Sequence, residues 1–329
     1  MATTRSPLKL RRLLAALCLT PTLAGPGAAD VADVVQDHAL PGYHRLTGAT
    51  AALAAIDSCA AGPLRSAWND AFDAWLDVAH LRLGPVEDDG RVLAIAFWPD
   101  PKGIGARQMT QLLKDADPAA LKPDHVAELS VAVRGLFGME RLLYADPPLP
   151  DAYACALTHA LADDLARMAS EIERGWQEGF AAALTSPGPG QRYLNDTETR
   201  QALMTALITG IEFNADTRVG RPLGTFDKPR PERAEARASG RSQHNIIRSL
   251  TALRAMAHAL HGQIPQTDAA FDRAIAQAEG VDLAGLDDPQ VWLKAEILGQ
   301  SIRAIRDAAM AEIAPALQVG VGFNAADGD

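Results

Sequence analysis

The segment LRSAWNDAFDAWLDVAHLRL, residues 64–83, has a clear helical pattern. Its large apolar side chains, beginning with Leu64, Trp68 and Phe72, recur every three or four residues, while charged residues occupy the other faces. This spacing places the apolar side chains along one side of an α-helix that packs on a core. No long alternating pattern typical of a half-buried strand competes with it, so the sequence predicts an all-α protein.

The same helical period extends along most of the chain, and glycine and proline clusters interrupt it. The strongest interruption is SPGPGQ at residues 186–191. We therefore expect two packed helical bundles, over residues 30–187 and 188–329, whose similar length is compatible with a divergent duplication. The expected helices cover residues 31–57, 60–83, 104–115, 123–144, 151–184, 196–219, 238–262, 266–278 and 288–315.

The composition excludes several classes of protein. The 329 residues are 48% hydrophobic and 22% charged, which argues against a disordered chain. The formal net charge of −10 disfavours nucleic acid or an anionic membrane surface as the main partner. The sequence also lacks the H-E-x-x-H, C-x-x-C-H, G-x-S-x-G and Walker motifs of zinc peptidases, haem proteins, serine hydrolases and nucleotide-binding proteins.

Residues 1–29 have the pattern of a secretory signal peptide. Four basic residues precede an apolar run over residues 13–23, and small residues follow it. Removing the four basic residues would take the formal net charge from −10 to −14. Cys18 follows Leu17, which is too large for the usual lipoprotein processing site, so a lipid anchor is the less favoured alternative. We expect a periplasmic protein with no transmembrane segment once the signal is removed.

Export bears on the two remaining cysteines, Cys59 and Cys155. In an oxidising compartment two thiols commonly form one bridge, so we expect a disulfide. The alternative is two separate buried thiols, since free cysteine often serves as a small core residue.

A glutamate stands on an apolar helix face in SVAVRGLFGMERLLY, residues 130–144. Glu140 shares that face with Phe137 and other apolar side chains. A buried carboxylate needs an arginine, a metal or a hydrogen-bonding cluster from elsewhere in the fold. A structural ion pair and a functional site both satisfy this need. Gly135 and Gly138, three residues apart, indicate close approach of another backbone or of a ligand.

Several segments together resemble the imelysin-like proteins, a family of exported bacterial helical proteins classed as peptidases and linked to iron uptake. GLFGMERLLY, residues 135–144, is similar to the family's G-x-H-x-x-E motif, with Gly135 and Glu140 at the glycine and glutamate positions. Phe137 stands where the histidine would be. The resemblance extends over most of the chain through residues 38–46, 81–103, 230–246 and 320–329.

The resemblance implies a ligand cleft between the two bundles, near the motif helix. The residues it suggests for this cleft are Trp98, Asp100, Arg107, Gly135, Phe137, Glu140, Glu212, Arg218, Ser239 and Ser242. Several have simpler interpretations: Asp100 as a turn cap, Trp98 as a core residue, Ser239 and Ser242 as helix caps, and Glu212 as a solvated residue. Phenylalanine cannot bind a metal, so the remaining metal candidates are the oxygen donors Glu140, Asp100 and Glu212.

Three functions follow as hypotheses. The first is an exported imelysin-like binding protein for a small ligand, a divalent metal or iron, linked to iron acquisition and without intrinsic peptidase activity. The second is a metallopeptidase-like hydrolase, and the third is an envelope module that binds protein partners. The sequence does not identify the ligand, the metal or the oligomeric state.

Overall fold

The computed structural model describes residues 1–2 and 30–320. Nearly all of the signal segment and the last nine residues, which include most of the 320–329 segment, lie outside the described residues. Residues 30–320 are helical apart from their loops, and the only β-type pairing among them is an isolated bridge between Thr225 and Lys228. The predicted all-α fold is confirmed. No helix in this part of the chain combines the length and the apolarity needed to cross a bilayer.

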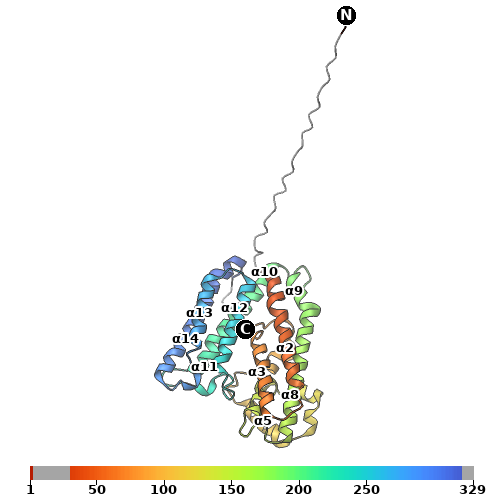
Figure 1. Cartoon of the computed structure of the whole chain (residues 1–329), viewed down its shortest axis with the longest axis vertical. Helices are drawn as coiled ribbons and strands as arrows, with labels where there is room; N and C mark the ends of the chain where they lie inside the picture. Colours follow the sequence, from red (N-terminus) through yellow and green to blue (C-terminus); the bar gives the residue numbers. More distant parts are fainter. Residues whose placement is uncertain (3–29, 321–329) are drawn as a thin grey trace.

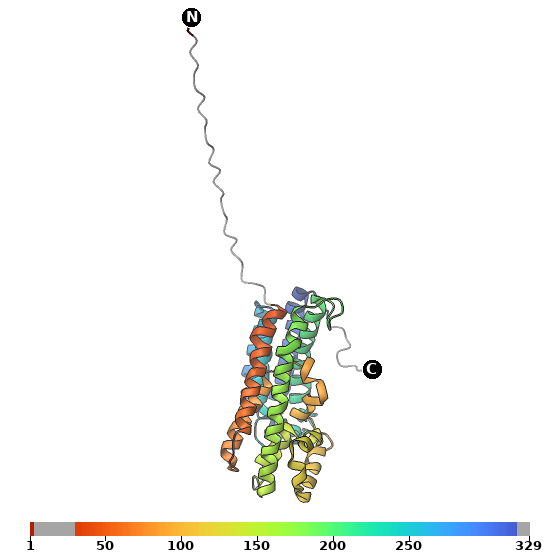
Figure 2. The same cartoon turned by 90° about the vertical axis from the view of Figure 1, so that its right-hand side faces the viewer.

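Helices from the first part of the chain form one bundle. The long helices α2 and α8 lie side by side along its length, and α3 packs against α2 (Figures 1 and 2). Its helices are α1 (Val31–Asp33), continued by the π-helical turn η1 (Val34–Ala39) into α2 (Leu40–Ala54), then α3 (Ala61–Leu76), α4 (Arg91–Ile95), α5 (Ile104–Asp115), α6 (Pro123–Glu128), α7 (Gly135–Leu143), and α8 (Ala152–Gly175) with η6 (Trp176–Phe180) and α9 (Ala181–Thr185).

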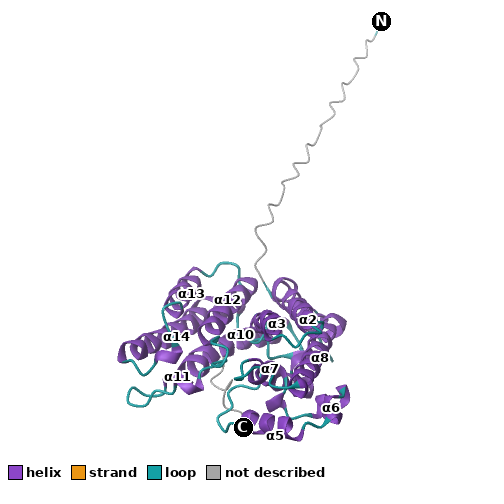
Figure 3. Ribbon diagram, turned by 60° about the horizontal axis from the view of Figure 1, so that its bottom comes forward, coloured by secondary structure: helices purple, strands orange, loops and turns teal. Residues whose placement is uncertain are grey.

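Helices after residue 195 form the second bundle. In it, α14 packs along α13 and α10, and α12 packs against α13 and α10. Its helices are α10 (Asp196–Glu212), continued by the π-helical turn η7 (Phe213–Val219) into α11 (Gly220–Leu223), then α12 (Ser242–Leu260), α13 (Pro265–Ala278) and α14 (Pro289–Leu317). Viewed towards one end, the two groups of helices lie next to each other (Figure 3).

The bundles meet where α12 packs against α3 and η1. Their buried apolar side chains belong to one continuous cluster. Polar pairs also cross the contact. Nε and Nη2 of Arg248 donate to the two carboxylate oxygens of Asp77, each at 2.7 Å, and Arg241 contacts Asp73. Bidentate arginine–carboxylate contacts fix direction as well as distance, so they define how α12 sits on α3.

The single helix predicted over residues 123–144 is wrong. The chain forms α6, leaves the helical path, and starts again as α7 at Gly135. Gly135 has a φ of 58°, and a Cβ there would collide with the carbonyl oxygens of Ala94 and Ile95. Periodicity does not reveal this break, because the apolar spacing continues across it while the backbone turns into a region that favours glycine. The close backbone approach expected at the two glycines is confirmed.

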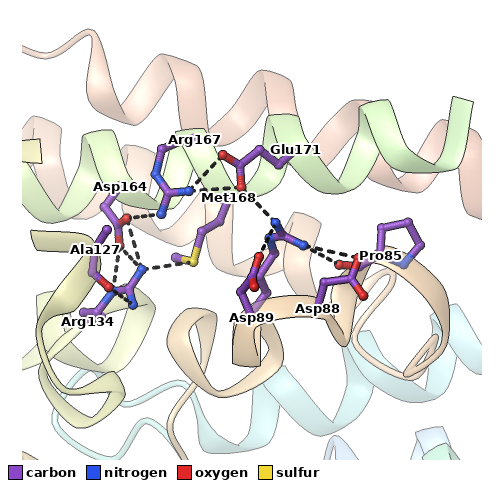
Figure 4. A network of polar contacts seen from close by, with 10 residues as sticks. Pro85, Asp88, Asp89, Ala127, Arg134, Asp164, Arg167, Met168 and Glu171 are labelled. Carbon is purple, nitrogen blue, oxygen red and sulfur yellow. Dashed lines mark hydrogen bonds and ion pairs between the residues drawn. The ribbon is translucent and has the colours of Figure 1, made fainter. Parts of the chain in front are cut away.

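Arg134, the residue before α7, is tied to α8 rather than to the motif helix. Its guanidinium donates to both carboxylate oxygens of Asp164, at 2.9 and 3.1 Å, and to the carbonyl of Ala127 at 2.8 Å. The pair is buried and continues along α8 through Arg167 and Glu171 (Figure 4). This network fixes the start of α7, and with it the direction in which the motif side chains point.

The predicted disulfide is confirmed. Cys59, just before α3, is bridged to Cys155 in the first turn of α8, with their Cα atoms 5.6 Å apart. The bridge closes a segment with a sequence separation of 96 residues and holds the α2–α3 connection against α8.

Candidate functional site

A cavity of about 340 Å³ lies between the bundles. Its lining comes from the end of α3 and the loop after it, α4, the loop after α4, α7, the end of α10, η7 and α12. Four residues suggested by the sequence line it, namely Trp98, Phe137, Glu212 and Arg218. The volume lies within the range of small-molecule sites, and a junction between two packed units is a common place for one.

Aromatic side chains form much of the wall. The rings of Trp98 and Phe213 meet edge to face, with centroids 6.0 Å apart. Phe137 lines the cavity while its ring packs edge-on against Phe72 in the core, at 5.5 Å. Only 4% of Phe137 is exposed, so the position that resembles the motif histidine is occupied by an apolar side chain that is anchored in the core.

A buried ion pair forms one side of the cavity. The guanidinium of Arg218 donates to the two carboxylate oxygens of Glu235 at 2.7 and 3.3 Å. Arg218 also donates to Ser249 and Asn214, at 2.9 and 3.2 Å, and Asn245 donates to Glu235 at 3.0 Å. These extra hydrogen bonds satisfy groups that would otherwise be costly to bury, so the pair is a rigid part of the wall.

The remaining carboxylates of the lining are paired with arginines of α14. Glu212 lies 2.8 Å from Arg306, and Asp216 lies 2.8 Å from Arg303. Arg82, in contrast, has no ion-pair or side-chain hydrogen-bond partner among residues 30–320. Its guanidinium stands over the Phe213 ring, 5.0 Å from the centroid, and burial lowers the pKa of this group.

A pair of buried histidines lies beside the cavity. His80 lines it, and the Nε2 atom of His80 is 2.9 Å from that of His38 on η1. Burial, and to a smaller extent the charge of Arg45, lowers the pKa of His38 from 6.5 to about 4. Burial also lowers the pKa of His80 well below 6.5, with further lowering by His38 and Arg218. Both rings are therefore neutral at pH 7, and one donates to the other.

Glu140 is buried, as expected, with 6% exposure, but its partner is neither an arginine nor a second carboxylate. One carboxylate oxygen accepts hydrogen bonds from the hydroxyl and the backbone N–H of Ser239, at 2.7 and 2.9 Å. Burial raises the pKa of Glu140, while the two bonds from Ser239 and the charge of Arg141 oppose the rise. Because Ser239 precedes α12, this contact joins the motif helix to the second bundle.

Several suggested residues lie outside the cavity lining. Asp100 accepts from the backbone N–H groups of Ile104 and Gly105, each at 2.8 Å, and so caps α5. Arg107 is exposed on α5, and its guanidinium donates to the carbonyl of Lys102. The hydroxyl of Ser242 donates to the carbonyl of Glu235 at 2.5 Å. Gly135 serves the backbone turn described above.

The three carboxylates suggested as metal ligands are not brought together. Asp100 caps α5, Glu140 binds Ser239, and Glu212 faces Arg306. Within the part of the chain that the structure describes, the only close group of three potential ligands is Cys59, Cys155 and His159, and its two sulfurs form the disulfide. Each of the three carboxylates is therefore held by a partner of its own.

Sequence reasoning missed most of the residues that line the cavity, among them Trp75, His80, Arg82, Phe213 and Glu235. Two of them, His80 and Arg82, end the apolar stretch of residues 64–83. A histidine and an arginine at the end of an apolar helix face could have indicated polar residues that line a buried site. Glu235 lies in the 230–246 segment quoted for its resemblance. Phe213 gave no signal, because it continues the apolar period of α10 into η7. π-Helical turns of this kind are frequent at functional sites.

Comparisons with known proteins agree with this architecture. The family model described as Imelysin, peptidase M75, matches residues 39–312. A crystal structure of an imelysin-like protein from Psychrobacter arcticum 273-4 has a TM-score of 0.75 at 21% identity, covering 89% of this chain and 96% of that one. A protein from Parabacteroides distasonis ATCC 8503, assigned as an iron-regulated protein A precursor, has a TM-score of 0.65 at 12% identity, covering 87% of this chain and 97% of that one. No curated protein matches this sequence.

The fold and the cavity define an all-α protein of two packed bundles with a candidate ligand site at their contact. Since the family model covers most of the sequence, the chain belongs to the imelysin family.

Proposed function

We propose that this protein is an exported, periplasmic binding protein that acts in iron acquisition and captures a small ligand in the cavity between its bundles. The observation that carries the proposal is that cavity of about 340 Å³, with aromatic walls and charged groups contributed by both bundles. The basic and apolar pattern of residues 1–29 supports export. The relative assigned as an iron-regulated protein A precursor supports the link to iron.

The alternative of a metallopeptidase is less well supported by the residues present. Phe137 lines the cavity at the position that resembles the motif histidine, and its side chain offers no donor atom. Glu140, the other motif residue, is engaged with Ser239. We therefore expect no intrinsic peptidase activity. Metal-dependent cleavage of a denatured protein by the unmutated chain, lost in Glu140→Ala, would contradict this part of the proposal.

Analysis of protein purified from its own cell envelope tests the binding function. Native mass spectrometry and elemental analysis should detect a small molecule or iron at about one per chain. Ala96→Phe places a large side chain in the cavity lining and should abolish the co-purifying species. Ala106→Phe, at an exposed position of α5, is the matched control and should retain it. Finding no bound species in the native protein, or an equal content in both variants, would count against the proposal.

A further inference from the structure

The charges around the cavity do not cancel. Its three carboxylates, Glu212, Asp216 and Glu235, each face an arginine of their own at 2.7 to 2.8 Å. Both histidine rings beside it are neutral at pH 7, because burial lowers their pKa values. Arg82 is left as a lining cation without a carboxylate partner among the described residues, so the site has a local excess of positive charge.

Two guanidinium groups contact the same aromatic ring, and burial together with the charge of Arg218 lowers the pKa of Arg82. The guanidinium carbons of Arg82 and Arg218 each lie 5.0 Å from the centroid of Phe213. Arg218 forms a direct ion pair with Glu235, whereas Arg82 feels the charge of Glu235 only at a distance. The two like charges repel each other, and an anion bound beside Arg82 would relieve that repulsion.

Two indole N–H groups of the lining have no hydrogen-bond partner among the described residues. Tryptophans elsewhere in the protein do have partners: the indole N–H of Trp68 donates to the carbonyl of Leu136, and that of Trp292 donates to the carbonyl of Leu223, both at 3.0 Å. The indoles of Trp75 and Trp98, which both line the cavity, donate to no residue between 30 and 320. Trp75 is only 3% exposed as a residue, but its N–H is not among the buried polar atoms without a partner, so this donor remains accessible. Indole N–H and guanidinium groups only donate, so they require a ligand with acceptor atoms.

The ring of Trp98 contributes a flat surface next to these donors. It stands at 83° to the ring of Phe213, and Phe137 adds a further apolar wall. Flat aromatic walls favour a planar or compact apolar body, because stacking and edge contacts are strongest against flat groups.

We propose that the cavity binds a small organic anion, whose carboxylate or similar oxyanion group is held by Arg82 and the free indole N–H groups while its planar body packs against the aromatic wall that Trp98 and Phe213 form. The inference rests on the proposed binding function and adds the chemical class of the ligand. It assigns roles to Arg82 and Trp75, which the sequence did not suggest for the site. A carboxylate suits this set because it accepts several hydrogen bonds in one plane and carries a negative charge that can pair with Arg82.

Calorimetric titration of the dialysed protein with two matched probes tests the inference. The probes are 2-naphthoate and the neutral 2-naphthalenemethanol, which share the same ring system and differ in charge. The wild-type protein should bind the carboxylate about tenfold or more tightly than the alcohol. Arg82→Gln should bring the two affinities close to each other. Arg174→Gln, an exposed arginine of α8 outside the lining, should leave the ratio unchanged. Trp98→Leu should weaken both probes.

The outcomes separate this inference from the binding function on which it rests. Equal affinity for the two probes, binding of neither, or an unchanged ratio in Arg82→Gln would overturn the proposal that the ligand is an organic anion. If the protein from its native envelope still carries a species that Ala96→Phe removes, the binding function stands without it. If no such species is found and naphthoate binds with the expected ratio, the ligand class holds and the link to iron fails.

Discussion

Acid should destabilise this protein well before its carboxylates are protonated, because His38 and His80 are buried as neutral rings. In the folded protein burial lowers the pKa of His38 to about 4, whereas an unfolded chain keeps the ordinary value of 6.5. The unfolded state therefore binds more protons between these two values, and stability is lost as the pH falls through that window. For His38 alone the loss from pH 7 is about 2 kcal/mol at pH 5 and about 3 kcal/mol at pH 4. His80 shifts in the same direction and adds to the loss.

Urea denaturation at pH 7, 6 and 5 measures this effect. One group acts in the opposite direction: burial raises the pKa of Glu140, so its protonation in the folded state stabilises the protein as the pH falls. Comparing the wild-type protein with a His38→Gln, His80→Gln double variant removes this common contribution. The double variant should lose less stability than the wild type between pH 7 and pH 5, by about 2 kcal/mol or more. His125→Gln, an exposed histidine of α6, should behave like the wild type. An equal pH dependence in the double variant and the wild type would refute the reasoning.

Three further predictions concern the disulfide and the motif helix. Replacing Cys59 and Cys155 by serine should lower the free energy of unfolding in urea by about 4 to 5 kcal/mol relative to the disulfide-bonded wild type, in the chain-entropy model. The reduced wild type, which lacks the bridge but keeps both cysteines, is the control for the substitutions. Glu140→Ala should cost about 1 to 3 kcal/mol, because it leaves the two donors of Ser239 without their acceptor, whereas the exposed Glu128→Ala should change stability by less than about 0.5 kcal/mol. Phe137→His should lower the melting temperature by removing the edge-on contact with the core, and should raise zinc or iron affinity only if other donors can turn towards it, which titration with the metal alone would show.

The fold could be predicted from the sequence because burial of one helix face imposes a period that the sequence must carry. Trp68 and Phe72 lie on such a face, and both are fully buried in the structure. The break at Gly135 could not be predicted in this way. A Cβ at this position would collide with the carbonyl groups of Ala94 and Ile95, which reach the site from another segment, so the turn requires glycine. Apolar spacing reports which side chains are buried and contains no information about that encounter.

The candidate site could be predicted only in part. Trp98 and Phe137 were found through segments that resemble the family, and both line the cavity. Asp100 belongs to the same segment as Trp98 but caps α5, because its carboxylate lies directly before a turn and meets the backbone N–H groups four and five residues later. Trp98 and Asp100 are therefore close in sequence but differ in role, because backbone N–H groups near Asp100 bind its carboxylate.

Ligand charge is the property that sequence reasoning could approach least. The cavity brings together carboxylates and arginines whose formal charges nearly balance, and what matters is which of them are already paired. Asp216 is paired with Arg303, which lies 87 residues further along the chain, and Glu235 is paired with Arg218 on the π-helical turn η7. Only after these contacts are known does Arg82 stand out as the uncompensated cation. The overall charge of −10 would suggest a cationic ligand, while the pairing inside the cavity indicates an anionic one. The pairing of charges inside the cavity determines the preferred charge of the ligand, because screening in water limits the influence of surface charges beyond about 8 to 10 Å.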